Sequence, residues 1–160
     1  MSQPESLPDA TIRRARLQEA ALLTSLALRA KASWGYDAGF MAEAMEEIAI
    51  SPATLARVPF YVIERDGRVL GFYSVSDHGD GTIELTDLFV DPDFPRQGIG
   101  RRLLEHAKQC ARTTGQQMLL IRSDPHAEPF YLGAGATYLD PASPHTHGGA
   151  DLPLLRIDLE

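Results

Sequence analysis

The sequence predicts one α/β domain built on a mixed sheet, and three observations support that prediction. The chain has 160 residues, which corresponds to about one domain. Segments with apolar residues at helical spacing are interspersed with strand-like segments. An Asp66-Gly67 pair joins two strand-like segments and is a strong hairpin signal. Strands and helices in this order favour a mixed sheet over a helical bundle or an all-β sandwich.

The composition is that of a globular protein. Hydrophobic residues make up 44% and charged residues 23%, which excludes a disordered or fibrous chain. The net charge of -7 disfavours nucleic acid and anionic membranes as partners and favours a cationic one. No run approaches about 18 apolar residues, so no membrane-spanning segment is expected. One cysteine, and an N-terminus unlike a signal peptide, indicate the cytoplasm.

The N-terminal third is expected to hold one strand and two helices. Residues 1–10 are expected to form a flexible arm, and residues 11–160 a single domain that begins with a strand over Thr11–Arg16. In the first helix, apolar residues recur at helical spacing at Leu22, Leu23, Leu26 and Ala30. The second helix begins after Asp37 as its N-cap and has its apolar residues at Phe40, Met41, Ala44, Met45 and Ile48.

The middle of the chain predicts three consecutive antiparallel strands. Phe60–Glu64 and Val69–Val75 flank the turn at 65–68, and a second turn at 77–81 leads into Ile83–Val90. Short connections of this kind join neighbouring antiparallel strands. The three segments are therefore expected to form a meander.

The third of these strands contains an irregularity. Its apolar side chains lie at odd positions at Ile83 and Leu85, but at even positions after Asp87. Side chains alternate across a strand with a period of two, so this shift indicates a β-bulge near Asp87.

The last third predicts two helices and two strands. A glycine-containing turn precedes a helix that is expected to stop at Gly115, with its apolar face formed by Ile99, Leu103, Leu104, Ala107 and Ala111. A buried strand over Met118–Ile121, a short helix over His126–Gly133 and a final strand over Leu154–Leu159 follow.

The turn before that long helix is a candidate anion site. The first amides of a helix have no intrahelical acceptor and lie at its positive end. Gly98 and Gly100 allow an anion to approach them, and Arg96 and Arg101 add positive charge, so a diphosphate would fit. Neither a Walker loop nor a dinucleotide fingerprint is present. The alternative is a tight turn that serves close packing.

Two runs of the sequence resemble the GNAT superfamily of N-acetyltransferases. They are LFVDPDFPRQGIGRRLLEHA at 88–107 and DPHAEPFYLGAGA at 124–136. The resemblance implies a mostly antiparallel, twisted sheet of six or seven strands with about four helices. It also implies a fourth strand that is bulged and splays from its neighbour, so that the pantetheine arm of acetyl-CoA can pair with its exposed backbone.

The same resemblance implies the cofactor-binding residues. Backbone groups of Leu88, Phe89 and Val90 would bind pantetheine. The pyrophosphate would be held by Arg96, Gln97, Gly98, Ile99, Gly100 and Arg101. Two positions depart from the family pattern. Pro95 stands where Gln or Arg is usual, and Asp124 stands where an Asn is usual, so the contact of Asp124 with the cofactor is in doubt.

For catalysis, the resemblance places Tyr131 where the family has its general acid, which protonates the departing thiolate of coenzyme A. The other reading of Tyr131 is an ordinary amphipathic residue at a helix edge. An amine with a pKa near 10 arrives protonated, so a base is needed. Glu84 is the first candidate and Asp87, which could also bind substrate, the second; both could be solvated strand residues, and a chain of waters could replace either.

Five further residues are considered as candidates for a functional site. Trp34 and Tyr36 lie between the first two helices, where they could form the wall of an acceptor site or pack the helices onto the sheet. His145 and His147 lack a third metal ligand at useful spacing, so a solvated loop and no metal are expected. Cys110 is expected to pack within its helix rather than to act as a nucleophile.

These residues favour an acetyl-CoA-dependent N-acetyltransferase that works by direct attack in a ternary complex, without a metal. Its acceptor would be an amine of a small molecule or a peptide, and the resemblance is compatible with a homodimer. One alternative is a non-catalytic acyl-CoA-binding regulatory module. A nucleotide-binding protein that uses the glycine turn is a more distant alternative.

Overall fold

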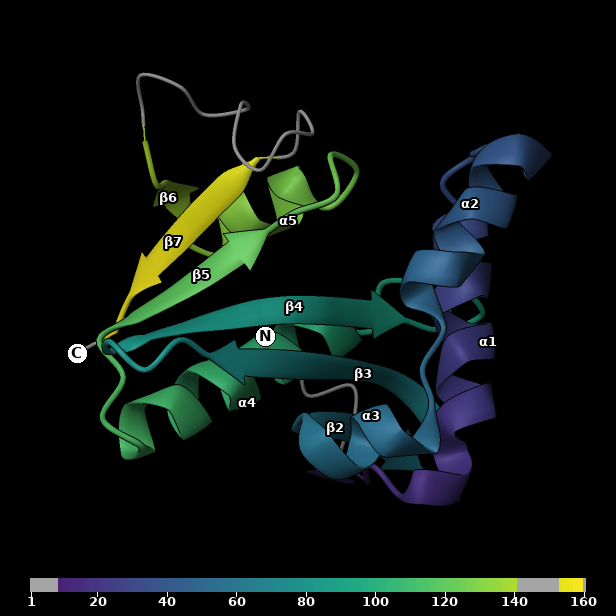
Figure 1. The fold of residues 1–160 in the computed structure, drawn as a ribbon, viewed down its shortest axis with the longest axis horizontal. Helices are drawn as coiled ribbons and strands as arrows, with labels where there is room; N and C mark the ends of the chain where they lie inside the picture. The colour runs from purple at the N-terminus through teal and green to yellow at the C-terminus, as the bar shows by residue number, and fades with distance from the viewer. Residues whose placement is uncertain (1–8, 141–152, 160) are drawn as a thin grey trace. The chain divides into compact units, whose positions relative to one another are not determined.

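The computed structural model describes residues 9–140 and 153–159 and shows a mixed α/β fold (Figure 1). Its strands are β1 (Thr11–Arg14), β2 (Phe60–Arg65), β3 (Arg68–Asp77), β4 (Thr82–Val90), β5 (Met118–Arg122), β6 (Thr137–Tyr138) and β7 (Leu154–Asp158). Its helices are α1 (Ala20–Ala32), α2 (Ala38–Ile48), α3 (Pro52–Arg57), α4 (Ile99–Thr113) and α5 (Glu128–Gly133), with a 3-10 turn at Leu17–Glu19.

The strands form one seven-stranded sheet in the order β1-β2-β3-β4-β5-β7-β6. β1–β2, β2–β3, β5–β7 and β6–β7 pair antiparallel, and β4–β5 pairs parallel. The predicted α/β class and the mostly antiparallel sheet are therefore confirmed. The described residues form five α-helices where about four were expected, because α3 was not predicted.

The chain divides into two compact units, which are described separately. Unit 1 comprises Met1–Ser74 and Asp87–Leu104, and unit 2 comprises Val75–Thr86 and Glu105–Glu160. β3, β4 and α4 each contribute residues to both units. The predicted arm at 1–10 falls largely outside the described residues. Of its last two residues, Ala10 is buried and its carbonyl oxygen accepts a hydrogen bond from Arg102 at 3.3 Å.

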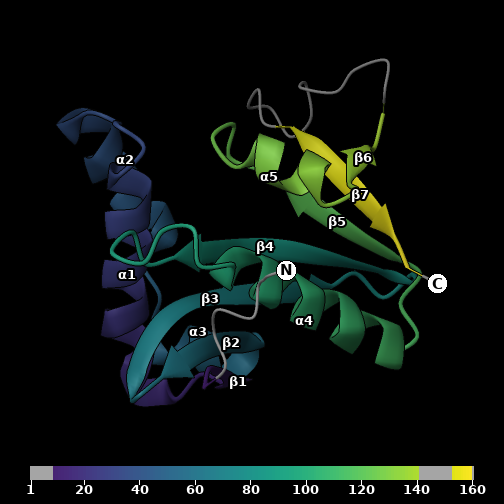
Figure 2. The same cartoon turned by 180° about the vertical axis from the view of Figure 1, so that it is seen from behind.

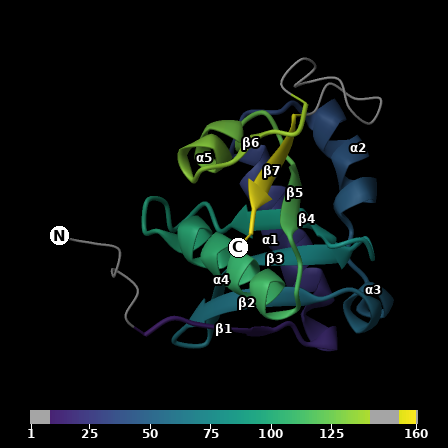
Figure 3. The ribbon, with the colours of Figure 1, turned by 90° about the vertical axis from the view of Figure 1, so that its left-hand side faces the viewer.

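In unit 1, β1, β2 and β3 lie side by side (Figure 3). Asp66 and Gly67 have φ values of 54° and 78°, as the two central residues of a type I′ turn require, so the predicted hairpin is confirmed. One apolar cluster joins α1 and α3 to the sheet. Its buried members are Ala20, Leu23, Leu26, Ala27, Leu55, Phe60, Val62, Val69 and Phe72.

The helices of unit 1 differ in part from expectation. Asp37 caps α2 as predicted, since its Oδ1 accepts from the Phe40 amide at 2.7 Å. However, Leu22, Phe40 and Met45 are 47%, 41% and 53% exposed, because each helix carries more apolar residues than its buried face accommodates. The first strand stops at Arg14 rather than Arg16, since the 3-10 turn begins directly afterwards.

In unit 2, the first half of β4 pairs with β5 from Thr82 with Met118 to Leu85 with Ile121. Figures 1 and 2 show α5 lying beside β5 and β7. Alternate residues of the strands are buried, namely Ile83, Leu85, Leu119, Ile121, Leu155 and Ile157. Ile83 and Leu85 confirm the alternation of buried side chains that was predicted for this part of β4. Glu84 and Arg122 therefore lie on the opposite face of the sheet from these buried residues.

Gly71 on β3 lies against the backbone of β4 within unit 1. A Cβ at this position would lie 2.7 Å from the carbonyl oxygen of Phe89 and 3.1 Å from a methyl group of Leu103. We expect Gly71→Ala to lower the free energy of unfolding by about 2 kcal/mol, because overpacking a filled core typically costs that much. Urea denaturation would measure the change.

Gly39→Ala is the matched control, since a Cβ at Gly39 in α2 would meet only a side-chain oxygen at 3.6 Å. That substitution should leave stability unchanged or raise it, because alanine favours a helix over glycine. Equal losses in the two variants would contradict the steric argument.

Candidate functional site

The start of α4 has the backbone geometry of an anion site. The Gly98 carbonyl accepts the first intrahelical bond, from the Arg102 amide at 3.0 Å, so the amides of Ile99, Gly100 and Arg101 have no acceptor within the helix. Arg96 and Gly98 both have positive φ values, 60° and 78°, and residues in this conformation form concave arrangements of backbone N–H groups.

This loop fits a diphosphate in shape and in charge. A Cβ added to Gly98 would meet no heavy atom within 4 Å, so the space beside it is open. Arg96 and Arg101 are both exposed and provide positive charge beside the helix start. Backbone donors, a positive helix end and two guanidinium groups are the donor set that a diphosphate requires.

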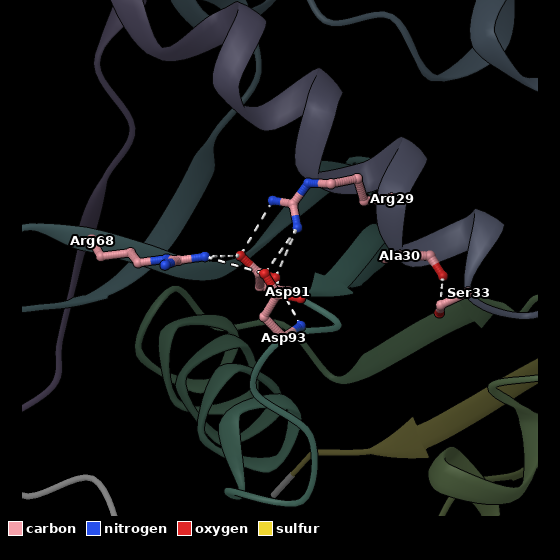
Figure 4. A network of polar contacts seen from close by, with 6 residues as sticks. All are labelled: Arg29, Ala30, Ser33, Arg68, Asp91 and Asp93. Atoms are coloured by element: carbon pink, nitrogen blue, oxygen red, sulfur yellow. Dashed lines mark hydrogen bonds and ion pairs between the residues drawn. The ribbon is translucent and has the colours of Figure 1, made fainter.

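Asp91 anchors this loop at the end of β4 (Figure 4). Its carboxylate is 2% exposed and accepts two hydrogen bonds from Arg29 of α1, at 2.9 and 3.2 Å, and one from Arg68 of β3 at 3.3 Å. It also accepts from the amide of Asp93 at 3.0 Å, and its own amide donates to Leu70 at 2.8 Å. The loop therefore starts from a charged group held by two other elements.

The ion pairs shift the pKa values of these groups. Burial alone would raise the pKa of Asp91, but the hydrogen bonds from Arg29, the Asp93 amide and Arg68 outweigh it and hold the pKa below its ordinary value. The hydrogen bond to Asp91 raises the pKa of Arg29. Asp91 is therefore ionised throughout the neutral range.

The β2–β3 hairpin also contacts the loop. The Arg68 guanidinium lies 4.6 Å from the centre of the Phe94 ring, and Arg65 donates to the side-chain oxygen of Gln97 at 3.4 Å. A guanidinium above an aromatic ring is an attractive contact. Gln97, one of the predicted cofactor residues, lies in the loop before α4 and is therefore contacted by a residue of β2.

The C-terminal part of β4 carries Leu88, Phe89 and Val90, which are all half-buried. The parallel pairing of β4 with β5 ends earlier, at Leu85. Asp87 accepts a hydrogen bond from the Ser74 hydroxyl at 2.8 Å, which positions this carboxylate beside β3. The bulge near Asp87 and the pantetheine contacts stay predictions; the irregularity that the sheet does show lies between Ile63 and Glu64.

Trp34 and Tyr36 belong to an aromatic group in unit 1. Trp34 lies 6.5 Å from Phe89 between ring centres, and Tyr36 stacks on Phe40 at 4.0 Å. The Lys31 ammonium lies 5.9 Å from the centres of three rings, Trp34, Tyr36 and Phe40. The structure thus brings the predicted acceptor residue Trp34 to the strand predicted to bind the cofactor.

Glu84 is held between two basic side chains in unit 2. His78 Nε2 lies 3.0 Å from one carboxylate oxygen, and Arg122 Nε lies 3.7 Å from the other. The Glu84 side chain is 16% exposed. A half-buried carboxylate beside an imidazole has the groups that proton transfer needs, and neither basic partner was foreseen from the sequence.

Tyr131 is buried in α5 at 5% exposure, with its ring 5.1 Å from that of Phe130. Asp124 precedes this helix and turns its carboxylate toward His126, accepting from the His126 amide at 2.8 Å and facing its ring nitrogen at 2.9 Å. The Asp124 carboxylate therefore stabilises the turn before α5 through hydrogen bonds, in addition to its predicted contact with the cofactor.

The structure gives no catalytic or metal-binding role to the remaining candidates, which are His145, His147 and Cys110. His145 and His147 lie outside the described residues. Cys110 is half-buried in α4 with its sulfur 3.7 Å from a ring nitrogen of His106. Within the part of the chain that the structure describes, no three His, Cys, Asp or Glu side chains gather as a metal site would require. None of the helices described there is long and apolar enough to cross a membrane.

Sequence reasoning missed Asp91, Arg29 and Arg68. Asp91 directly precedes Pro92 in the sequence, and its partners lie 62 and 23 positions away in the chain. Its place directly after a predicted strand was the one feature of the sequence that could have marked Asp91 as a site residue. Nothing local to the sequence paired it with those arginines.

Comparison with known proteins agrees with this fold. A family model described as an acetyltransferase (GNAT) domain matches residues 56–135, half of the chain. The chain therefore belongs to the GNAT acetyltransferase family, whose activity is acetyl transfer. The match covers β2 through α5 and so includes the glycine loop and Tyr131. The search of curated proteins gave no match.

Solved structures share the fold at low sequence identity. The PaiA N-acetyltransferase of Thermoplasma acidophilum, in complex with coenzyme A, is 18% identical with a TM-score of 0.77, over 93% of this chain and 98% of that one. A GCN5-related N-acetyltransferase of Rhodopseudomonas palustris is 16% identical with a TM-score of 0.75, over 93% and 95%. The ribosomal-protein-S18-alanine N-acetyltransferase of Escherichia coli is 21% identical with a TM-score of 0.67, over 94% of both chains.

Proposed function

We propose that this chain is an N-acetyltransferase that uses acetyl-CoA to acetylate an amine of a small molecule or a peptide. The loop at the start of α4 supports the proposal most directly, because its backbone amides, open glycine and two arginines suit a diphosphate. The family match supports the acetyl transfer itself. When bound, acetyl-CoA would supply the thioester whose acetyl carbon the amine attacks.

The chain's own residues would hold the reactants and move two protons. Residues Arg96–Arg101 bind the diphosphate, and backbone groups of Leu88–Val90 bind the pantetheine arm. Glu84, directly or through a water, takes a proton from the incoming ammonium, so that the amine nitrogen has a free electron pair. Tyr131 would give its phenolic proton to the sulfur as the carbon–sulfur bond breaks. The nitrogen would lose its second proton on becoming an amide, and that proton would restore the phenol. The amine attacks directly in a ternary complex, without a covalent enzyme intermediate.

A ligand panel tests the cofactor assignment. Coenzyme A and acetyl-CoA should raise the melting temperature of the protein, because a ligand that binds only the folded state stabilises it by mass action. ATP and NAD should raise it less. Equal stabilisation by all four ligands would contradict the assignment, and stabilisation by acetyl-CoA without turnover of any amine in a broad panel would favour a non-catalytic acyl-CoA-binding module.

Glu84→Gln tests the base. We expect this variant to lower kcat about tenfold at neutral pH, since amide nitrogen and oxygen atoms cannot take up the proton and general base catalysis typically contributes at least that much. Initial-rate kinetics with an acceptor amine found in the panel would measure the change in kcat. Glu105→Gln is the control, because Glu105 is an exposed side chain of α4 that pairs with Lys108 and has no proposed role in the reaction. If both variants kept the parent kcat, a water chain would be the better assignment.

We also propose a cytoplasmic location, which the single cysteine supports. A monomer and a homodimer are both compatible with the family, and sedimentation of the full chain would distinguish them. The single-domain organisation of residues 11–160 is likewise part of this proposal.

A further inference from the structure

Unit 1 contains a cavity of about 520 Å3 that none of the proposed cofactor, acceptor or catalytic residues lines. It is bounded by β1, the 3-10 turn, α1 and the β2–β3 hairpin. Four arginines and three acidic residues form its charged wall, namely Arg13, Arg16, Arg29, Arg68, Glu19, Glu64 and Asp91. A cavity of this size is typical of sites for small molecules.

The acidic side chains of this wall are already paired. Arg13 donates to Glu19 at 3.1 and 2.7 Å and to Glu64 at 3.0 Å, while Arg29 and Arg68 pair with Asp91. The bond from Arg13 is the main cause of a lowered pKa at Glu19. The pKa of Asp91 is lowered as well, so Glu19 and Asp91 are ionised at neutral pH. At formal charges the residues of the wall sum to +1, in a chain whose net charge is -7.

Two guanidinium groups of the wall have unpaired donors, and only that of Arg16 is exposed. Arg13 has a buried Nε without a hydrogen-bond partner among the residues that the structure describes. Arg16 is exposed, and its guanidinium has no carboxylate at ion-pair distance among residues 9–140 and 153–159. The Arg13 Nε has almost no accessible surface, so the exposed Arg16 guanidinium is the donor that a ligand in the cavity can reach. Guanidinium groups match planar carboxylates in geometry.

We propose that this cavity binds a small organic monoanion, a carboxylate with a short apolar body, through Arg16. Arg29 and Arg68 pair with Asp93 as well as with Asp91, so Arg16 is the cation of the wall that a single negative charge would match. A dianion would face the carboxylates of Glu19 and Glu64. The apolar body would lie on Leu22, Leu26 and Val69, which also line the cavity. Leu22 is 47% exposed without such a ligand, although it belongs to a helix whose neighbouring leucine is fully buried.

Calorimetric titration of the full chain, without coenzyme A, tests this proposal independently of the acetyl transfer. The probes are hexanoate, its neutral counterpart hexanamide, and inorganic phosphate. We expect hexanoate to bind at least tenfold more tightly than either of the others. No binding of hexanoate, or equal binding of hexanamide, would overturn the proposal. Equal binding of phosphate would overturn the assignment of an apolar body.

Substitutions locate the binding. Arg16→Gln and Arg16→Glu should weaken hexanoate binding at least tenfold, the second more than the first, while the melting temperature confirms that both variants fold. Arg57→Gln is the matched control, because Arg57 is an exposed arginine at the end of α3 that does not line the cavity. It should bind hexanoate like the parent. Unchanged binding in both Arg16 variants would place the carboxylate elsewhere and overturn the proposal.

Discussion

Tyr131→Phe is expected to lower kcat about a hundredfold while leaving the KM for acetyl-CoA nearly unchanged. The substitution removes only the phenolic oxygen, and a positioned general acid contributes about a hundredfold or more. Because Tyr131 is 5% exposed and the ring remains, packing in α5 should be preserved. Steady-state kinetics with acceptor and acetyl-CoA varied in turn would separate the two effects.

A second tyrosine supplies the comparison. Tyr61 on β2 stacks on Tyr73 at 5.1 Å and has no proposed role in the reaction, so Tyr61→Phe should leave kcat within about twofold of the parent. A pH profile would add a readout specific to proton transfer, because the high-pH limb of kcat should be altered in Tyr131→Phe alone. A parent-like kcat in Tyr131→Phe would remove this residue from the mechanism.

Asp91→Asn is expected to lower the free energy of unfolding by about 2 kcal/mol, because hydrogen bonds to charged groups typically contribute that much. The loss is smaller than for a fully buried pair, since Arg29 and Arg68 are 45% and 54% exposed. The amide retains the size of the side chain but cannot balance Arg29 and Arg68. The KM for acetyl-CoA should also rise, since the loop that begins at Asp91 would lose its anchor. Asp93→Asn is the control, as Asp93 is 68% exposed and should change stability by less than about 0.5 kcal/mol.

The acid dependence of stability follows from the same group. The folded-state pKa of Asp91 lies below its ordinary value, which is near 4, so its contribution is fully present above about pH 4 and is lost as the pH falls through the lower folded-state value. Urea denaturation between neutral and acid pH should therefore show a smaller acid-induced loss in Asp91→Asn than in the parent. Parallel curves for the two proteins would contradict this account.

The sequence predicted most of the fold because its signals were local. The Asp66-Gly67 turn, the Asp37 cap and the stop at Gly115 act within a few residues, and the structure has a turn or helix end at each. α3 was missed although Ser51 caps it and Pro52 begins it, because six residues are too short for a periodic pattern. The exposed side chain of Leu22 could not be foreseen, since burial depends on what packs against the helix.

The candidate site was predictable only where a motif is continuous in the chain. The glycine loop and Tyr131 stand in such motifs, and the family match includes both. The groups that surround them come from distant positions. Glu84 lies between His78 and Arg122, and Asp91 lies beneath Arg29, through contacts that depend on strand pairing and helix placement. No spacing rule within the sequence indicates such pairs.

The interleaving of the two units limits how this protein can be divided. Each unit is made of two separate stretches of chain, and the polypeptide passes from one unit to the other three times, within β3, β4 and α4. No single cut can therefore release either unit intact, and a protease that cleaves inside β4 would damage both. Such an arrangement favours cooperative loss of structure, so fluorescence and circular dichroism should report the same melting midpoint.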